Sequence, residues 1–272
     1  MKKSNLGDRM KGYETVTRYV LPRKGYTMIR IDGKAFHTYT RGLERPFDWG
    51  LVDDMDATAK YLCKNIQNAV CAFVQSDEIS ILLCDFEKNE TNAWFDNTVQ
   101  KMCSVSASMA TTGFNKARIS RLISRGKILT EFDDMKWGEF DSRVYQLPAK
   151  YEVSNYLIWR QQDTVKNSIS SVAQTMFSHK ELNGKNGNQK QEMMFQKDGT
   201  NWNDFDPKLK RGRMITKETY EVDVRIPNIP TVVLAVSTTR TRWVSNAPPT
   251  FTEDRDYLNK LVPDREISRL LV

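Results

Sequence analysis

The first half of the chain alternates between short apolar runs and amphipathic stretches. Residues 28–31 combine apolar and β-branched side chains, which is typical of a strand buried on at least one face. Apolar residues spaced three and four apart then predict a helix, with Asp48 as its N-terminal cap. The buried stripe of this helix is expected to be Leu51, Met55, Ala59, Leu62 and Ile66. The polar residues between them are expected on its solvated face: Asp53, Asp54, Asp56, Lys60 and Lys64.

Further along, residues 69–74 and 79–83 are apolar runs joined by the polar segment 75–78, which predicts a β-hairpin. A second amphipathic helix begins near Trp94, and residues 140–147 predict a fourth strand. The order β-α-β-β-α-β is that of the split βαβ unit in ferredoxin-like domains. The expected fold is therefore α+β, an antiparallel sheet with helices on one face.

The second half predicts a helical and basic C-terminal region. A long helix over residues 151–177 carries an apolar stripe at Val165, Ile169, Val172 and Met176. Residues 183–190, rich in Gly and Asn, indicate a mobile loop, and residues 220–226 and 231–236 indicate strands. Pro248 and Pro249 are expected to end the ordered core, with a helical arm or an intersubunit contact after them.

The composition indicates which class of protein this is and which metal ions it could bind. A chain of 272 residues with 39% hydrophobic and 28% charged residues indicates a soluble globular protein. It has no apolar run of membrane-span length and no apolar signal region at its start, so we expect a cytoplasmic protein and no membrane partner. The four cysteines lack zinc or redox spacing and are expected to be buried, and two histidines are too few for a histidine-based site. A metal here should be held by oxygen, which favours magnesium.

The charge indicates an anionic partner. The net charge is +7 and the pI is about 9.1, a balance that is common among proteins that bind nucleic acid, although a solvated basic surface without a partner remains an alternative. Residues 179–217 hold nine Lys or Arg against five Asp or Glu, which places a local excess of four positive charges there.

Two acids are predicted to meet at one edge of the sheet. Asp32 ends the first strand and is followed by Gly33, whose missing Cβ allows close backbone approach to a ligand. In a split βαβ unit the end of strand one and the turn between strands two and three share an edge, so Asp32 and Asp77 should lie together. Paired carboxylates suit a two-metal site for nucleotidyl transfer, while the alternative is an ordinary solvated hairpin tip.

These residues resemble the tRNA-His guanylyltransferase superfamily, whose members add nucleotides to the 5′ end of RNA. The resemblance covers residues 29–37, 75–80, 140–143 and 156–163. It implies a polymerase-like palm, with residues 1–147 as the catalytic domain and residues 148–272 completing the catalytic unit and the RNA and subunit contacts. It also implies ATP and GTP or other nucleoside triphosphates as substrates, tRNA as partner, and a homotetramer.

The resemblance also implies roles for individual residues. Asp32 and Asp77 would be catalytic and would bind two magnesium ions together with the Gly33 carbonyl. The triphosphate would be bound by these residues and by Lys34, Ala35, Phe36, His37, Arg45, Ser76 and Lys101. On the long helix and beyond it, RNA contacts are expected at Asp163, Asn167, Lys190, Lys208, Lys210 and Arg211.

One segment departs from the guanylyltransferases that add the extra guanosine of tRNA-His. Those enzymes carry His-Ile-Asn-Asn-Leu-Tyr-Asn where this chain has residues 165–171, and only Asn167 is shared. The departure matches the bacterial and archaeal guanylyltransferase-like proteins, which repair 5′-truncated tRNA by templated addition after ATP-dependent activation. Guanosine addition to tRNA-His is the nearer alternative, and a palm-type nucleotide cyclase or a non-catalytic RNA-binding protein is more remote.

Overall fold

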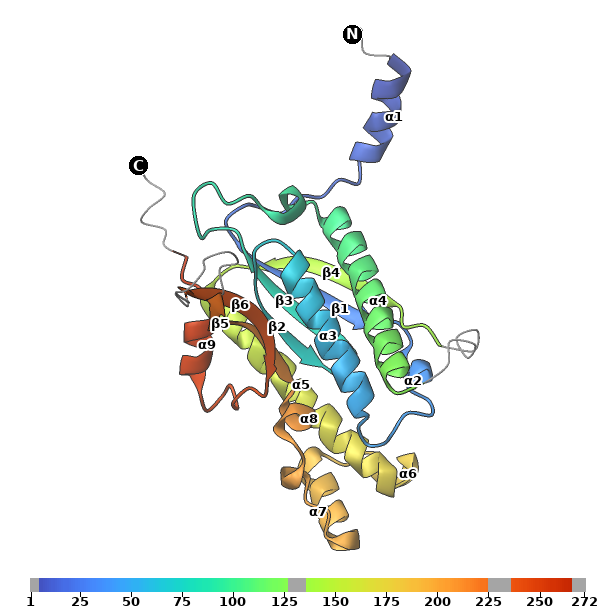
Figure 1. Cartoon of the computed structure of the whole chain (residues 1–272). Coiled ribbons are helices and arrows are strands. Elements are labelled where there is room, and N and C mark those ends of the chain that lie inside the picture. The colour runs from blue at the N-terminus through green and yellow to red at the C-terminus, as the bar shows by residue number, and fades with distance from the viewer. Residues whose placement is uncertain (1–4, 127–135, 225–235, 266–272) are drawn as a thin grey trace.

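The structure is a computed structural model that describes residues 5–126, 136–224 and 236–265, and its centre is one antiparallel sheet. In this part of the chain the sheet has six strands in the order β4-β1-β3-β2-β5-β6 (Figure 1). Their bounds are Tyr26–Gly33 (β1), Ala69–Gln75 (β2), Glu78–Cys84 (β3), Phe140–Leu147 (β4), Arg213–Val224 (β5) and Val236–Asn246 (β6).

The first four strands confirm the predicted split βαβ topology. Strands β1 and β2 both pair antiparallel with β3, so they run parallel to each other with β3 between them. Strand β4 pairs with the other side of β1. Asp32 consequently lies opposite Glu78 on one neighbour and opposite Asp141 on the other, beside the β2–β3 turn.

The two helices of the predicted palm cover one face of the sheet, as expected, and helices of the C-terminal region cover the other. Helices α3 (Trp49–Asn65) and α4 (Val99–Ser124) pack against one face (Figure 1). Helices α5 (Lys150–Met176) and α9 (Arg255–Leu261) pack against the other. Helix α1 (Asn5–Thr15) has no buried residue and stands away from the sheet. None of the helices in the described ranges is long and apolar enough to span a membrane.

A separate small core forms on the second half of α5. Helices α6 (His179–Leu182), α7 (Gly187–Asp198) and α8 (Pro207–Arg211) follow α5 in the chain. The buried residues of this second core are Ile169, Val172, Ala173, Leu182, Met194 and Trp202. The apolar stripe predicted for this helix therefore packs mainly against these short helices.

Several segments differ from the sequence-based prediction. The expected loop over 183–190 contains the start of α7, because Asn186 and Gln189 form a reciprocal capping box with two hydrogen bonds of 3.0 Å. Strand β5 begins at Arg213, earlier than the predicted residue 220, and residues 225–226 and 231–235 of the predicted strands lie outside the described residues. The core continues past Pro249, since Phe251, Leu258 and Val262 are buried.

The acids of α3 are only partly solvated. Asp48 caps the helix as predicted, accepting a 2.8 Å hydrogen bond from the Leu51 amide. Asp54 and Asp56, however, are buried and paired, with Arg121 at 2.6 Å and Arg213 at 2.6 Å. A buried carboxylate needs such a partner because removing its charge from water is costly. The cysteines agree better with expectation: Cys63, Cys71 and Cys84 are buried and Cys103 is partly buried.

Candidate functional site

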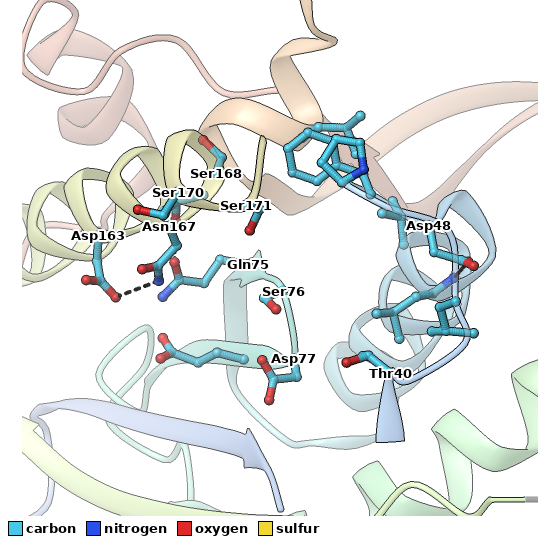
Figure 2. Close-up of a pocket in the computed structure, with 18 of the residues that line it drawn as sticks. Thr40, Asp48, Gln75, Ser76, Asp77, Asp163, Asn167, Ser168, Ser170 and Ser171 are labelled. Atoms are coloured by element: carbon cyan, nitrogen blue, oxygen red, sulfur yellow. Dashed lines mark hydrogen bonds between the residues drawn. The ribbon is translucent and has the colours of Figure 1, made fainter. Parts of the chain in front are cut away.

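Asp32 and Asp77 lie together at one edge of the sheet, as the topology predicted. Asp32 is next to last in β1, and Asp77 sits in the two-residue turn between β2 and β3. Both line a cavity of about 610 Å³, shown in part in Figure 2. This volume is in the range typical of pockets for small ligands. The predicted pair of acids thus faces a space large enough for a nucleotide.

Residues close to the two acids in sequence adopt unusual backbone conformations. Ser76, beside Asp77, has φ 44°, and Ala35, two residues after Gly33, has φ 53°. Non-glycine residues in this left-handed region are strained, and such strain gathers at functional sites. Gly33 has a packing role besides the predicted one, since a Cβ there would lie 2.2 Å from the ring of Phe36.

The surroundings of Asp77 make its charged form less favourable. Burial raises the pKa of the Asp77 carboxyl above its usual value, and the nearby Asp32 and Glu78 carboxylates raise that pKa further. Hydrogen bonds from the Asp77 amide and from Ser76 act in the opposite direction. A site of this kind favours a bound cation because the cation offsets the repulsion between the carboxylates.

A buried ion-pair network fixes α5 to the sheet beside the acids. Arg160 donates two hydrogen bonds to Glu78, at 2.8 and 2.7 Å, and a third of 3.0 Å to Asp163. Arg30 lies 3.3 Å from Glu78, and Ser80 shares a 2.7 Å hydrogen bond with the Tyr156 hydroxyl on α5. Glu78 is therefore paired with arginine. Asp32 and Asp77 share the lining of the cavity with Glu44, Asp48 and Asp163, of which Asp48 caps α3 and Asp163 is paired with Arg160.

The cavity has one partly apolar wall and one polar, hydroxyl-rich wall. Residues 40–52, between α2 (Phe36–Tyr39) and the first turn of α3, supply the first wall, including Leu43, Phe47 and Leu51. The second wall is the face of α5 that carries Asn167, Ser168, Ser170, Ser171 and Gln174. Figure 2 shows the two walls on opposite sides of Ser76 and Asp77. The segment that departs from the guanosine-adding enzymes thus lines the cavity directly.

Only some of the other residues predicted to bind nucleotide line the cavity. Arg45 and Ser76 line the cavity, whereas Lys34 forms an exposed ion pair with Glu139 at 2.6 Å. His37 is exposed. Two further residues among them do not line the cavity. The side chain of Phe36 is buried among aromatic rings, and Lys101 lies over the Phe95 ring near the start of α4.

Likewise, only some of the residues predicted to contact RNA lie at the cavity. Asp163 and Asn167 line the cavity, and Lys190 reaches it through a 3.0 Å hydrogen bond to Ser170. Lys208 and Arg211 on α8 are partly exposed. Lys210 is buried, because its ammonium donates to the Asn203 carbonyl at 2.5 Å and lies over the Trp202 ring, so it holds the second core together and is not free for phosphate.

The sequence did not reveal three features of the site. Arg160 and Glu78 are separated by 82 positions in the chain, so their pairing emerges only from the fold. Arg213 is buried at the cavity through its ion pair with Asp56, and Thr164 donates a 2.5 Å hydrogen bond to the Gln75 side chain.

The described residues contain no group of three His, Cys, Asp or Glu side chains placed to hold a metal ion.

Comparisons with known proteins identify a matching family and similar solved structures. A family model described as tRNAHis guanylyltransferase matches residues 7–148. A bacterial tRNA(His) guanylyltransferase-like protein in complex with ATP is 41% identical, with a TM-score of 0.81 over 95% of this chain and 99% of that one. A GTP complex of the same description is 39% identical, with a TM-score of 0.76 over 95% of this chain and 99% of that one.

A more distant relative carries a functional name. The tRNA(His) guanylyltransferase of Saccharomyces cerevisiae is 28% identical over 217 residues, which are 74% of this chain and 86% of that protein. The shared region therefore includes most of both proteins. The family model ends at residue 148, whereas the likeness to this relative and to the bacterial structures extends over α5.

Proposed function

Because this chain belongs to the tRNAHis guanylyltransferase family and is a nucleotidyltransferase, we propose that it adds nucleotides to the 5′ end of tRNA in the 3′–5′ direction, reading the opposite strand as template. Its substrate would be a tRNA that has lost nucleotides from its 5′ end. The observation that carries the proposal is the meeting of Asp32 and Asp77 at a nucleotide-sized cavity.

Magnesium is part of the proposal, and the residues present fit it. Mg²⁺ in phosphoryl-transfer sites is held by one or two carboxylates together with substrate phosphates and water, so a third protein carboxylate is not required. Asp32 and Asp77 supply the two carboxylates, and the Gly33 carbonyl is the proposed third protein oxygen. When bound, the metal would lower the pKa of the attacking hydroxyl and offset triphosphate charge.

The chain's own residues would bind and orient the two substrates. In the proposed reaction, ATP first transfers AMP to the 5′-monophosphate of the RNA and releases diphosphate. The 3′-hydroxyl of the incoming nucleotide then attacks the activated 5′ phosphate, and AMP leaves. Ser76 and Arg45 would hold phosphate at the mouth of the cavity, and the partly apolar wall formed by residues 40–52 would exclude water from one side of a bound nucleotide.

Templated repair is favoured over guanosine addition by the α5 wall. At the cavity-lining positions 168, 170 and 171 this chain has serine, where the guanosine-adding enzymes carry Asn, Tyr and Asn. Asp163, Asn167 and Lys190 are the proposed RNA contacts at this wall, with Lys208 and Arg211 on α8. A homotetramer, a cytoplasmic location and the division of the chain at residue 147 stay predictions.

The function is tested with two 5′-labelled, monophosphorylated tRNAs, ATP and all four nucleotides. One tRNA is a non-His species that lacks its first nucleotide, and the other is full-length tRNA-His. We expect preferential extension of the truncated tRNA by the nucleotide that pairs with the opposing base, and a changed product when that base is changed. Extension of tRNA-His alone, with guanosine regardless of template, would support the guanosine-adding alternative instead.

Magnesium should also stabilise the folded protein in the absence of nucleotide. Binding to the native state alone raises the melting temperature in proportion to the logarithm of metal concentration. We expect a magnesium-dependent increase in Tm by scanning fluorimetry that is absent in Asp32→Asn and Asp77→Asn. An exposed acid of α3 offers a control, since Asp53→Asn should keep the full increase. An equal increase in all four proteins would mean that magnesium acts elsewhere.

A further inference from the structure

Trp159 is half exposed beside the site, although the cavity described above does not include it. Its exposed fraction is 50%, and it lies on α5 directly before Arg160. The Arg160 guanidinium carbon is 4.4 Å from the centre of the indole ring, and that of Arg30 is 6.0 Å from it. The Tyr156 ring contacts the indole at a centroid distance of 5.8 Å. An aromatic ring bordered by two arginines is thus presented to solvent.

The orientation of this ring is fixed by buried groups. Arg160 is 6% exposed in its side chain and is held by Glu78 and Asp163, so the cation under the indole cannot move away. A cation–π contact of this kind stabilises the ring in place. A ring that is already ordered loses little conformational entropy when a ligand binds to its open surface.

The residues around Trp159 extend from the proposed catalytic acids to the edge strand of the sheet. Arg30 and Asp32 are two positions apart in β1 and lie on the same face of the sheet. Arg143 on the edge strand β4 lies opposite Arg30, with 57% of its side chain exposed. Its ion pair with Asp141 is 3.8 Å long and exposed, and such pairs contribute little, so the guanidinium is available to another anion.

We propose that Trp159 is a stacking platform for the terminal nucleobase of the RNA substrate and that Arg143 binds the adjoining phosphate. Every base has a π-face, so an indole accepts each of the four bases, which suits an enzyme that extends different RNA ends. The neighbouring guanidinium supplies the positive charge that the RNA backbone requires. That the partner is RNA rests on the proposed function, whereas the platform follows from the geometry of Trp159 and its arginines.

Stacking can be observed without catalysis. A truncated tRNA carrying 2-aminopurine as its 5′-terminal base is titrated with protein in the absence of nucleotide. Stacking on an aromatic ring at position 159 should quench the fluorescence in the wild type and in Trp159→Phe, and Trp159→Ala should lose the quenching. Tyr151→Ala is the matched control, because Tyr151 is 65% exposed on the same helix. Quenching that Trp159→Ala leaves unchanged would overturn the platform.

Kinetics provide the second readout. Because base stacking on an aromatic side chain changes binding by about tenfold or more, Trp159→Ala should raise the KM for truncated tRNA by about that factor. Its kcat and its KM for ATP should stay within about twofold, and Trp159→Phe should recover most of the RNA affinity. If the wild type adds no nucleotide yet shows Trp159-dependent quenching, the proposed function fails and the platform stands. If Trp159→Ala adds nucleotide normally, with unchanged KM and quenching, the platform fails and the proposed function stands.

Discussion

Asp32→Ala and Asp77→Ala should each reduce nucleotide addition to truncated tRNA by about a thousandfold or more. A metal ion that stabilises charge in the transition state contributes several kcal/mol, and each 1.4 kcal/mol is about a tenfold change in rate. Both acids line the cavity, where Glu78 and Asp163 are paired with Arg160 and Asp48 caps α3, so these three acids have other roles. The measurement is single-turnover addition of nucleotide to a labelled RNA at saturating ATP.

Asp53→Asn is the matched control for this loss. Asp53 is an exposed acid on α3 and is not among the residues that line the cavity. Its removal should leave the rate within about threefold of the wild type, as surface changes away from a site usually do. Equal losses in all three variants would contradict a specific role for Asp32 and Asp77, and retained activity in either alanine variant would exclude the two-acid mechanism.

Arg160→Met should destabilise the protein by about 3–5 kcal/mol, because it leaves the Glu78 carboxylate buried without its main partner. Arg30 lies 3.3 Å from Glu78, but its buried Nε makes no hydrogen bond within the described part of the chain, so it does not replace two well-formed bonds. The free energy of unfolding is measured by chemical denaturation followed by tryptophan fluorescence.

A double variant separates the pair's own contribution from the cost of breaking it. Adding Glu78→Gln to Arg160→Met removes the uncompensated charge, so the double variant should be more stable than Arg160→Met alone. Additive losses, or a loss below about 1 kcal/mol in Arg160→Met, would show that the buried pair does not secure α5 on the sheet.

The fold and the two acids were accessible from the sequence because each depends on local patterns. Alternating apolar runs identified β1 to β4 in their order, and that order alone placed Asp32 beside Asp77. The α7 helix was also within reach, since Asn186 and Gln189 have the spacing of a capping box. Glycines and asparagines around Asn186 indicated a loop more strongly than that single pair indicated a helix.

The remaining features depend on contacts between distant segments. Asp54 and Asp56 occupy polar positions in the α3 pattern, and only their partners Arg121 and Arg213 make burial tolerable. Lys210 likewise lies in a basic run that favours solvent, yet the Asn203 carbonyl and the Trp202 ring hold it inside. Periodicity describes one element at a time, so it cannot identify a charge that another element will neutralise.

The division of α5 between two cores bears on how this family can evolve. Its first half packs against the catalytic sheet through Val153 and Leu157, and its second half belongs to the core formed with α6 to α8. Substitutions on the cavity-facing side of residues 165–171 can therefore change the lining of the cavity while the packing of the sheet is conserved. New specificities can accumulate on this half of the helix, so divergence among relatives is expected to concentrate there and to spare the palm.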